Sequence, residues 1–346
     1  MLASPFESAA HTSGAAITGR RVASIAVVAG LIGAVGAVTP PVIGHGRAGA
    51  APGLSFKVNS ATRIYPGDTP RGQDDEVVRA RGIAVDNHAR IEFLALAPAP
   101  RGLTTDDYLV VLDSGKTFIQ HAANQQFTPA NDLFGGPAVV AINRVLGGGN
   151  ARGFRGGGGG GGGGGVRRGG GGGGPGRGRG ARGSVGEGFL NQIELLDVTF
   201  KLEKLGASDP IDGRPTQHYR VTTDYRILWG DQGFPAHAVT EVWTTPLPIR
   251  IPNPFEPLIV ADQSSDGPLI EYALKVRSIR AQIEEGGTPI KVVTTTALTN
   301  VHDIVGFQGF VSDDPKNDKL TIVQQTQITG IQPADVDPKL VTVPTP

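Results

Sequence analysis

The sequence predicts a mainly β fold of the α+β kind, in which one antiparallel sheet is accompanied by one or two helices. Three observations support this class. From His218 to Trp229 a mainly apolar set of side chains alternates with a mainly polar set, as in a strand with one buried and one exposed face. Several other segments share this two-residue period, whereas Pro268–Glu285 has the three- and four-residue spacing of a helix. The chain of 346 residues contains no cysteine, so packing rather than disulfides must stabilise the fold.

The first half of the chain is expected to form a series of antiparallel strands. Apolar periodicity marks five of them, over Leu54–Val58, Val77–Val85, Ala89–Leu96, Tyr108–Asp113 and Lys116–His121. Ser114 and Gly115 would join the last two strands as a two-residue hairpin turn. A short helix is expected from Pro137 to Leu146, because proline is favoured at the first helical position and apolar residues follow at helical spacing.

The second half is expected to contribute further strands and the longer helix. The strands are predicted over Leu196–Leu202, His218–Trp229, Ala238–Thr244, Ile290–Thr299 and Leu320–Ile328. In the first of them Leu196, Val198, Phe200 and Leu202 should share one face. The proline-rich stretch Pro246–Pro257 should be irregular, and the helix over Pro268–Glu285 should stop at Gly286-Gly287.

Residues 1–50 have the organisation of an export signal. Arg20-Arg21 precede the uncharged run Val22–Val38, and Ala48-Gly49-Ala50 matches a small-residue cleavage site. The mature chain would then begin near Ala51, and the protein would be periplasmic or secreted. In the alternative the segment is not cleaved, because its seventeen uncharged residues approach the length of a membrane span, and residues 22–38 anchor the protein in the inner membrane.

Residues 147–186 form a compositionally distinct insert. They hold 25 of the 52 glycines and seven arginines, with no acidic residue. Glycine loses the most conformational entropy on ordering and supplies no apolar area, so this insert is expected to be disordered. Closing a loop of forty residues costs only about 1.8 kcal/mol more than closing one of five. Residues 51–146 and 187–346 are therefore expected to form two parts of the same β domain.

The sequence indicates no reaction, metal or cofactor. The seven histidines are scattered singly, without the spacing of a zinc site. Asp313–Asp318 has the composition of a turn, which accounts for its acidic residues without calcium. Gly115-Lys116-Thr117 matches the end of a phosphate-binding loop, but Val110 occupies the position of the first glycine that such a loop needs. We therefore expect a protein that is not an enzyme.

Five stretches of the chain resemble a family of uncharacterised bacterial exported proteins related to the LolA/LppX lipoprotein-carrier fold. They are LDSGKT at 112–117, LFGG at 133–136, GRPTQHYRVTTDY at 213–225, EVW at 241–243 and IKVVTTT at 290–296. The resemblance implies a curved antiparallel sheet, or half-barrel, that wraps helices in its concave side. Some members of that superfamily hold acyl chains there, and no catalytic residues are attached to these motifs.

The resemblance and the stock of large apolar residues together suggest a cavity for a lipid-like or other hydrophobic ligand. Its candidate lining residues are Phe200, Tyr219, Tyr225, Trp229, Trp243 and Ile279. The alternative is a structural or envelope-interaction protein in which the same side chains fill the core. Alternation along the strands is the same for a hollow and a filled interior, so the sequence leaves both hypotheses open.

The insert suggests a further set of partners. Its Arg-Gly repeats resemble segments that bind RNA through phosphate charge and guanidinium stacking, but an exported protein meets little RNA and Phe154 is the insert's only aromatic residue. A plain linker is favoured. Contact with anionic lipid headgroups or with the protein's own acidic surface is the intermediate hypothesis, because residues 51–146 and 187–346 carry 22 basic and 31 acidic residues. The oligomeric state stays open.

Overall fold

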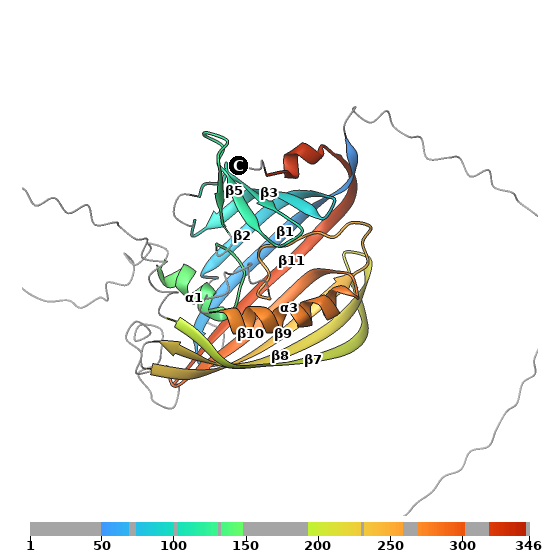
Figure 1. Ribbon diagram of the computed structural model, residues 1–346. Coiled ribbons are helices and arrows are strands. Elements are labelled where there is room, and N and C mark those ends of the chain that lie inside the picture. Colours follow the sequence, from blue (N-terminus) through green and yellow to red (C-terminus); the bar gives the residue numbers. More distant parts are fainter. Residues whose placement is uncertain are drawn as a thin grey trace, which may run out of the picture. The chain divides into compact units, whose positions relative to one another are not determined.

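The computed structural model describes residues 50–68, 74–99, 103–130, 133–147, 193–229, 232–258, 269–301 and 318–343 (Figure 1). All of them belong to one compact unit that spans Gly46–Pro346. The predicted signal segment and the glycine-rich insert lie outside the described residues, apart from their end residues Ala50 and Gly147. The same holds for the predicted turn Asp313–Asp318, of which only Asp318 is described.

The fold is a single sheet of eleven strands. In chain order they are β1 (Ala51–Pro66), β2 (Glu76–Val85), β3 (His88–Ala97), β4 (Tyr108–Val111), β5 (Thr117–Gln120), β6 (Phe127–Pro129), β7 (Ile193–Ile211), β8 (Arg214–Trp229), β9 (Gln232–Thr245), β10 (Thr288–Thr299) and β11 (Lys319–Val336). The helices in the described ranges are α1 (Ala138–Gly147), α3 (Ile270–Glu284) and the short 3-10 helix η2 (Pro338–Val341). This confirms the predicted mainly β class and both predicted helices.

The strands lie in the order β6-β5-β4-β3-β2-β1-β11-β10-β9-β8-β7, and every neighbouring pair is antiparallel. The sheet is open, with β6 and β7 at its edges. Its central pair joins the first strand of the sheet to the last, since Ala51 lies opposite Val336 and Pro66 opposite Leu320. Each half of the sheet is thus a meander of sequential strands.

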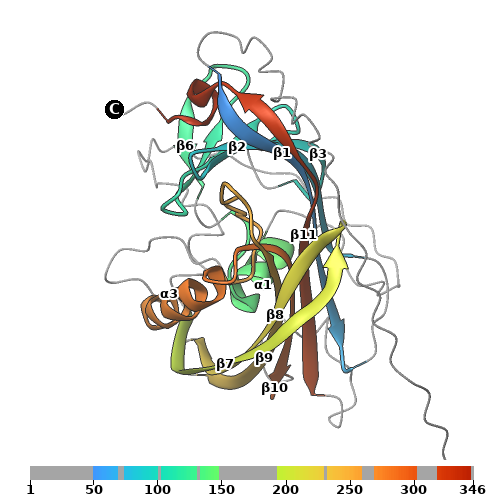
Figure 2. The ribbon, with the colours of Figure 1, turned by 90° about the vertical axis from the view of Figure 1, so that its right-hand side faces the viewer.

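The two faces of the sheet are covered differently. Helices α1 and α3 lie on one face, which we call the inner face, whereas η2 lies on the other, the outer face, against β2 and β3 (Figure 2). One apolar cluster packs α1 and α3 against β7–β11. A second cluster packs residues 247–255 against β1–β5. The core therefore lies on the inner face, and irregular chain covers it where no helix does.

Strand β8 shows how the sequence determines these faces. Tyr219, Val221, Thr223, Tyr225 and Ile227 are buried, whereas Asp224 and Arg226 between them are exposed. Successive side chains of a strand point to opposite sides, so the apolar set reaches the inner face and the polar set reaches the outer face. This part of the prediction is confirmed residue by residue up to Ile227.

Three details differ from the sequence-based expectation. In β7 a bulge follows Leu196, where Asp197 has a φ of 54°, so Leu195 rather than Leu196 is buried beside Val198. The turn between β4 and β5 is longer than Ser114-Gly115, because the Leu112 N–H donates to the Lys116 carbonyl at 2.9 Å. Strand β11 continues past the predicted end at Ile328, since beyond Gln327 it pairs with β1 alone and tolerates proline there.

The tip of the β7–β8 hairpin reaches this extended part of β11. Asp212 accepts a hydrogen bond from the Gly330 N–H at 2.6 Å, and the Arg214 guanidinium donates to the Ile331 carbonyl at 2.7 Å. Gly330 and Ile331 lie in the bulge of β11, where the register against β1 shifts between Ser55 and Lys57. The hairpin tip thus satisfies backbone groups that the bulge removes from the ladder.

Candidate functional site on the inner face

Four of the six predicted lining residues meet in one apolar cluster on the inner face. Phe200 comes from β7, Tyr219 and Tyr225 from β8, and Ile279 from α3. Tyr272 of α3 joins them, with ring centroids 5.4 Å from Phe200 and 6.1 Å from Tyr225. Tyr272 is not among the predicted lining residues, and the three- and four-residue spacing of the predicted helix is the sequence signal that places it here. We call these five residues the aromatic cluster.

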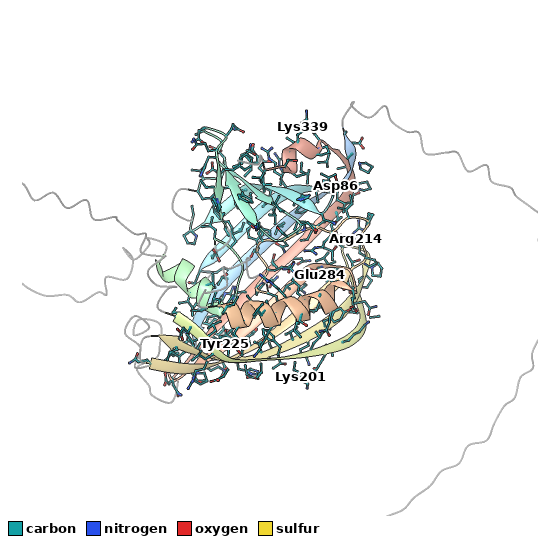
Figure 3. All side chains as sticks on the ribbon, in the orientation of Figure 1. Asp86, Lys201, Arg214, Tyr225, Glu284 and Lys339 are labelled. Atoms are coloured by element: carbon teal, nitrogen blue, oxygen red, sulfur yellow. The ribbon has the colours of Figure 1, made fainter. Side chains whose placement is uncertain are left out.

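The aromatic cluster is tightly packed. Tyr219, Tyr225 and Tyr272 are 2%, 5% and 4% exposed, and Phe200 and Ile279 are partly buried against the same cluster. Burial raises the pKa of Tyr225 and of Tyr272, so both phenols stay neutral at physiological pH. Figure 3 shows Tyr225 near the start of α3 and Glu284 near its end. The rings of Phe200 and Tyr225 thus lie against Tyr272 in the first half of this helix.

The structure describes the side chain of one of the two predicted tryptophans, Trp243. Trp243 lies on the outer face, where its ring stacks on His218 at 4.5 Å and receives the Lys291 ammonium at 4.5 Å from its centroid. The register explains this, because Val242, and not Trp243, lies opposite Tyr219. Its assignment to the inner cavity is therefore wrong. Trp229 ends β8, and its side chain lies outside the described part of the structure.

The second half of α3 meets a cluster of charged residues. Arg280 donates to Glu284 at 2.6 Å and lies 3.3 Å from a Glu256 carboxylate oxygen, and Arg250 donates to Glu284 at 2.9 Å. Glu256 is 2% exposed, and the Arg280 side chain is 18% exposed. We call these four residues the charged cluster. It joins α3 to the irregular residues 246–258.

Burial dominates the ionisation of Glu256. Desolvation raises its pKa to about 7, against the opposing effect of Arg280 and Arg250, while Glu284 raises it further. Its Oε1 atom makes no hydrogen bond within the described residues. Around neutral pH this carboxyl therefore exchanges a proton while enclosed between α3 and the sheet.

The position of Glu256 depends on the LFGG motif at 133–136. Gly136 donates its N–H to the Glu256 carbonyl at 3.1 Å, and its own carbonyl accepts from Gln324 of β11 at 3.1 Å. A Cβ on Gly135 would lie 2.6 Å from the carbonyl oxygens of both Glu256 and Pro254, so only glycine allows this approach. The motif therefore fixes residues 254–256 over the inner face.

The described histidines form ordinary polar contacts on strands and loops. His218 bonds Glu241 at 2.6 Å, and His237 bonds Asp224 at 2.7 Å. Both contacts join the neighbouring strands β8 and β9. No group of three or more potential metal ligands occurs within the ranges that the structure describes. The inner face therefore offers the rings of Phe200, Tyr225 and Tyr272 near the start of α3 and the charged cluster near its end.

Comparisons with known proteins leave the chain without an assigned relative. No protein-family model matches it, and no curated protein has a matching sequence. In the described ranges, no helix has the length and apolar character that crossing a membrane requires.

Proposed function

We propose that this is a non-catalytic, exported protein of the cell envelope that binds a lipid-like or other hydrophobic ligand. The sheet acts as a half-barrel, and the ligand lies between its inner face and α3. The observation that carries the proposal is the position of the aromatic cluster. It lies between β7, an open edge of the sheet, and a single helix, instead of between two sheets. One helix can move away from an edge strand without breaking the ladder of the sheet.

The charged cluster supports an amphiphilic ligand. Tyr272 and Arg280 are eight residues apart on α3, which corresponds to about 12 Å along the helix. An apolar chain on the aromatic cluster would thus bring its polar end to the guanidinium groups of Arg280 and Arg250. Guanidinium groups bind carboxylate and phosphate by paired N–H donors. A lipid with an anionic head group is the ligand class that suits both ends.

Copurified ligand is the first test. Protein purified from its exported form would be extracted with organic solvent and analysed for lipid by mass spectrometry. It would then be titrated with a fluorescent fatty-acid analogue. Because the chain has no cysteine, Leu274→Cys gives a single attachment point for a dye on α3. Leu274 is 57% exposed, so the label reports helix movement without entering the core.

A matched pair of variants locates the binding. Ile279→Glu places a charge in the partly buried apolar surface. It should lower the affinity for the analogue at least about ten-fold, which corresponds to about 1.4 kcal/mol of binding free energy. Leu274→Glu makes the same kind of change on the exposed side of the same helix and should leave affinity unchanged. The proposal would be rejected if no lipid copurifies and the analogue shows no saturable binding up to about millimolar concentration. A dissociation constant of that size corresponds to a binding free energy of only about 4 kcal/mol.

A structural or envelope-interaction protein is the second candidate. The observation that favours it is the close packing of Tyr272, whose ring contacts both Phe200 and Tyr225. In this case the inner face is an ordinary filled core. The titration above separates the two, because a filled core gives neither copurified lipid nor movement of the label at position 274.

Export has its own test, because it concerns residues outside the described ones. Mass spectrometry of the protein recovered from the envelope should show an N-terminus near Ala51. An intact Met1 in soluble protein of the cytoplasm would overturn export.

The same preparation tests the insert: anionic vesicles should retain the protein through its arginines at low salt and release it as salt is added. RNA retention would instead support the less favoured nucleic-acid hypothesis.

A further inference from the structure

A second concave site lies on the outer face of the sheet, opposite the core. It is a groove of about 520 Å³ that crosses β1, β2, β3 and β4 beside η2. Its lining includes Lys57, Arg81, Ile83, Arg90, Tyr108 and Leu340. The volume lies within the range of about 300–1,000 Å³ that small-molecule sites occupy. The outer face of an open sheet is normally flat, so the groove needs a local cause.

Helix η2 provides that cause. After β11 the chain turns back onto the outer face, where Asp337 caps η2 by accepting the Lys339 N–H at 3.0 Å. Val341 then packs on Val85 and Val336 in a small apolar cluster of its own. Leu340, the residue before Val341 in η2, is 42% exposed and forms a wall of the groove. The packing of η2 on the sheet thus keeps the Leu340 side chain at the groove, where it stays partly exposed.

The groove has more positive than negative side chains. Arg81 donates twice to Glu92, at 2.7 and 3.0 Å, which neutralises this pair. The Arg90 guanidinium lies 3.9 Å from the centroid of the Tyr108 ring, and Lys57 is exposed without an ion-pair partner among the described residues. The groove therefore keeps two positive charges beside apolar surface. This combination is complementary to an anion that carries an apolar body.

We propose that the outer groove binds a small organic anion with an aromatic or acyl body. The body lies against Ile83, Tyr108 and Leu340, and the carboxylate, sulfonate or phosphate of the ligand faces Lys57 and Arg90. The stacked position of Arg90 on Tyr108 holds the guanidinium in place, so it loses little freedom on binding. This site is on the opposite face from the aromatic cluster, and it stands whether or not the inner face binds lipid.

Two matched probes test the proposal on the full chain. Anilinonaphthalene sulfonate is a fluorescent anion with an aromatic body, and N-phenylnaphthylamine is the same body without the anionic group. The sulfonate should bind saturably and several-fold more tightly than the neutral probe. Its affinity should fall as salt is added, because an exposed charge contact is screened.

Variants at exposed positions locate the site without endangering the fold. Lys57→Glu should lower the affinity for the sulfonate by about three- to ten-fold. The variant removes one favourable contact between exposed charges and replaces it with a repulsive one. Leu340→Asp should weaken both probes, because it removes an apolar wall. Lys116→Glu, at an exposed loop residue outside the groove, makes the same change of charge as the first variant and should have no effect.

The outcomes separate this site from the inner face. If Ile279→Glu removes sulfonate binding while Lys57→Glu and Leu340→Asp leave it intact, the probe binds between α3 and the sheet and the outer groove is not a site. Equal weakening by Lys57→Glu and Lys116→Glu would show a general charge effect and would also overturn the proposal. Loss in Lys57→Glu and Leu340→Asp alone would establish it.

Discussion

At the scale of single residues, Glu256 makes the protein's stability depend on pH. Its pKa is about 7 in the folded protein against 4.5 for an ordinary glutamate. As pH rises between these values, the unfolded chain releases the proton before the folded one does, so stability falls across this window. Glu256→Gln removes this effect, and its advantage over the wild type should grow to about 3 kcal/mol by about pH 8.

Denaturant unfolding at a series of pH values measures this difference. Glu271→Gln is the control, since Glu271 lies on the exposed side of the same helix in an i,i+4 pair with Lys275. Its effect should stay within about 0.5 kcal/mol at every pH. If Glu256→Gln loses stability above neutral pH, then the contact with Arg280 outweighs desolvation and the raised pKa is contradicted.

Gly286 is a second residue on which the inner face depends. A Cβ there would lie 2.3 Å from the Tyr219 hydroxyl and 2.9 Å from Thr244 Oγ1. Gly286→Ala should therefore destabilise the fold by about 1–3 kcal/mol, through overpacking where α3 returns to the sheet. At Gly233 the nearest atom would be 3.5 Å away, so Gly233→Ala should have little effect in the same thermal melts. Equal melting temperatures for both variants would contradict the packing argument.

Trp243 shows where residue-scale prediction stopped. The sequence indicates alternation within each strand, and this alone placed Tyr219 and Tyr225 correctly on the inner face. Which side of β9 faces inward depends on its register against β8, and a shift of one residue exchanges the two sides. The size of the tryptophan ring suggested burial, yet Trp243 is covered from the outer face by His218 and Lys291.

At the scale of elements, the β7–β8 hairpin is coupled to β11. Asp212→Ala and Arg214→Ala each remove one hydrogen bond to the bulge of β11 and should cost about 1 kcal/mol each. Because both bonds hold the same contact, the double variant should cost clearly less than the sum of the two. Urea unfolding of the four proteins of this cycle measures the coupling. Strict additivity would show that the two bonds act independently.

Elements were predicted well where the pattern was regular and poorly where it was interrupted. The period of α3 and the alternation of β8 were sufficient, because each depends only on local spacing. Asp197 interrupts β7 with a residue of positive φ, which nothing in the sequence distinguishes from an ordinary exposed aspartate. The extension of β11 to Val336 likewise depends on β1 as a distant partner, and a glycine and a proline hide it locally.

At the scale of the whole molecule, the glycine-rich insert is expected to be dispensable for folding. The described strand β7 begins only at Ile193, and α1 ends at Gly147, so the intervening chain connects two elements of one unit. Replacement of residues 147–186 by a short Gly-Ser loop should leave the melting transition unchanged or slightly raised, because loop closure becomes less costly. A loss of cooperative unfolding would show that the segment contributes to the core.

The central pair of strands also has a consequence for the timing of folding. Strands β1 and β11 stand at opposite ends of the sequence, yet they join the two halves of the sheet. The ribosome must make every other strand of the sheet before this pair can form, so the sheet of the nascent polypeptide stays incomplete until β11 emerges. Contacts so distant in sequence form slowly. Strand β1 therefore keeps one edge unpaired until β11 has been made, and the two halves of the sheet join last.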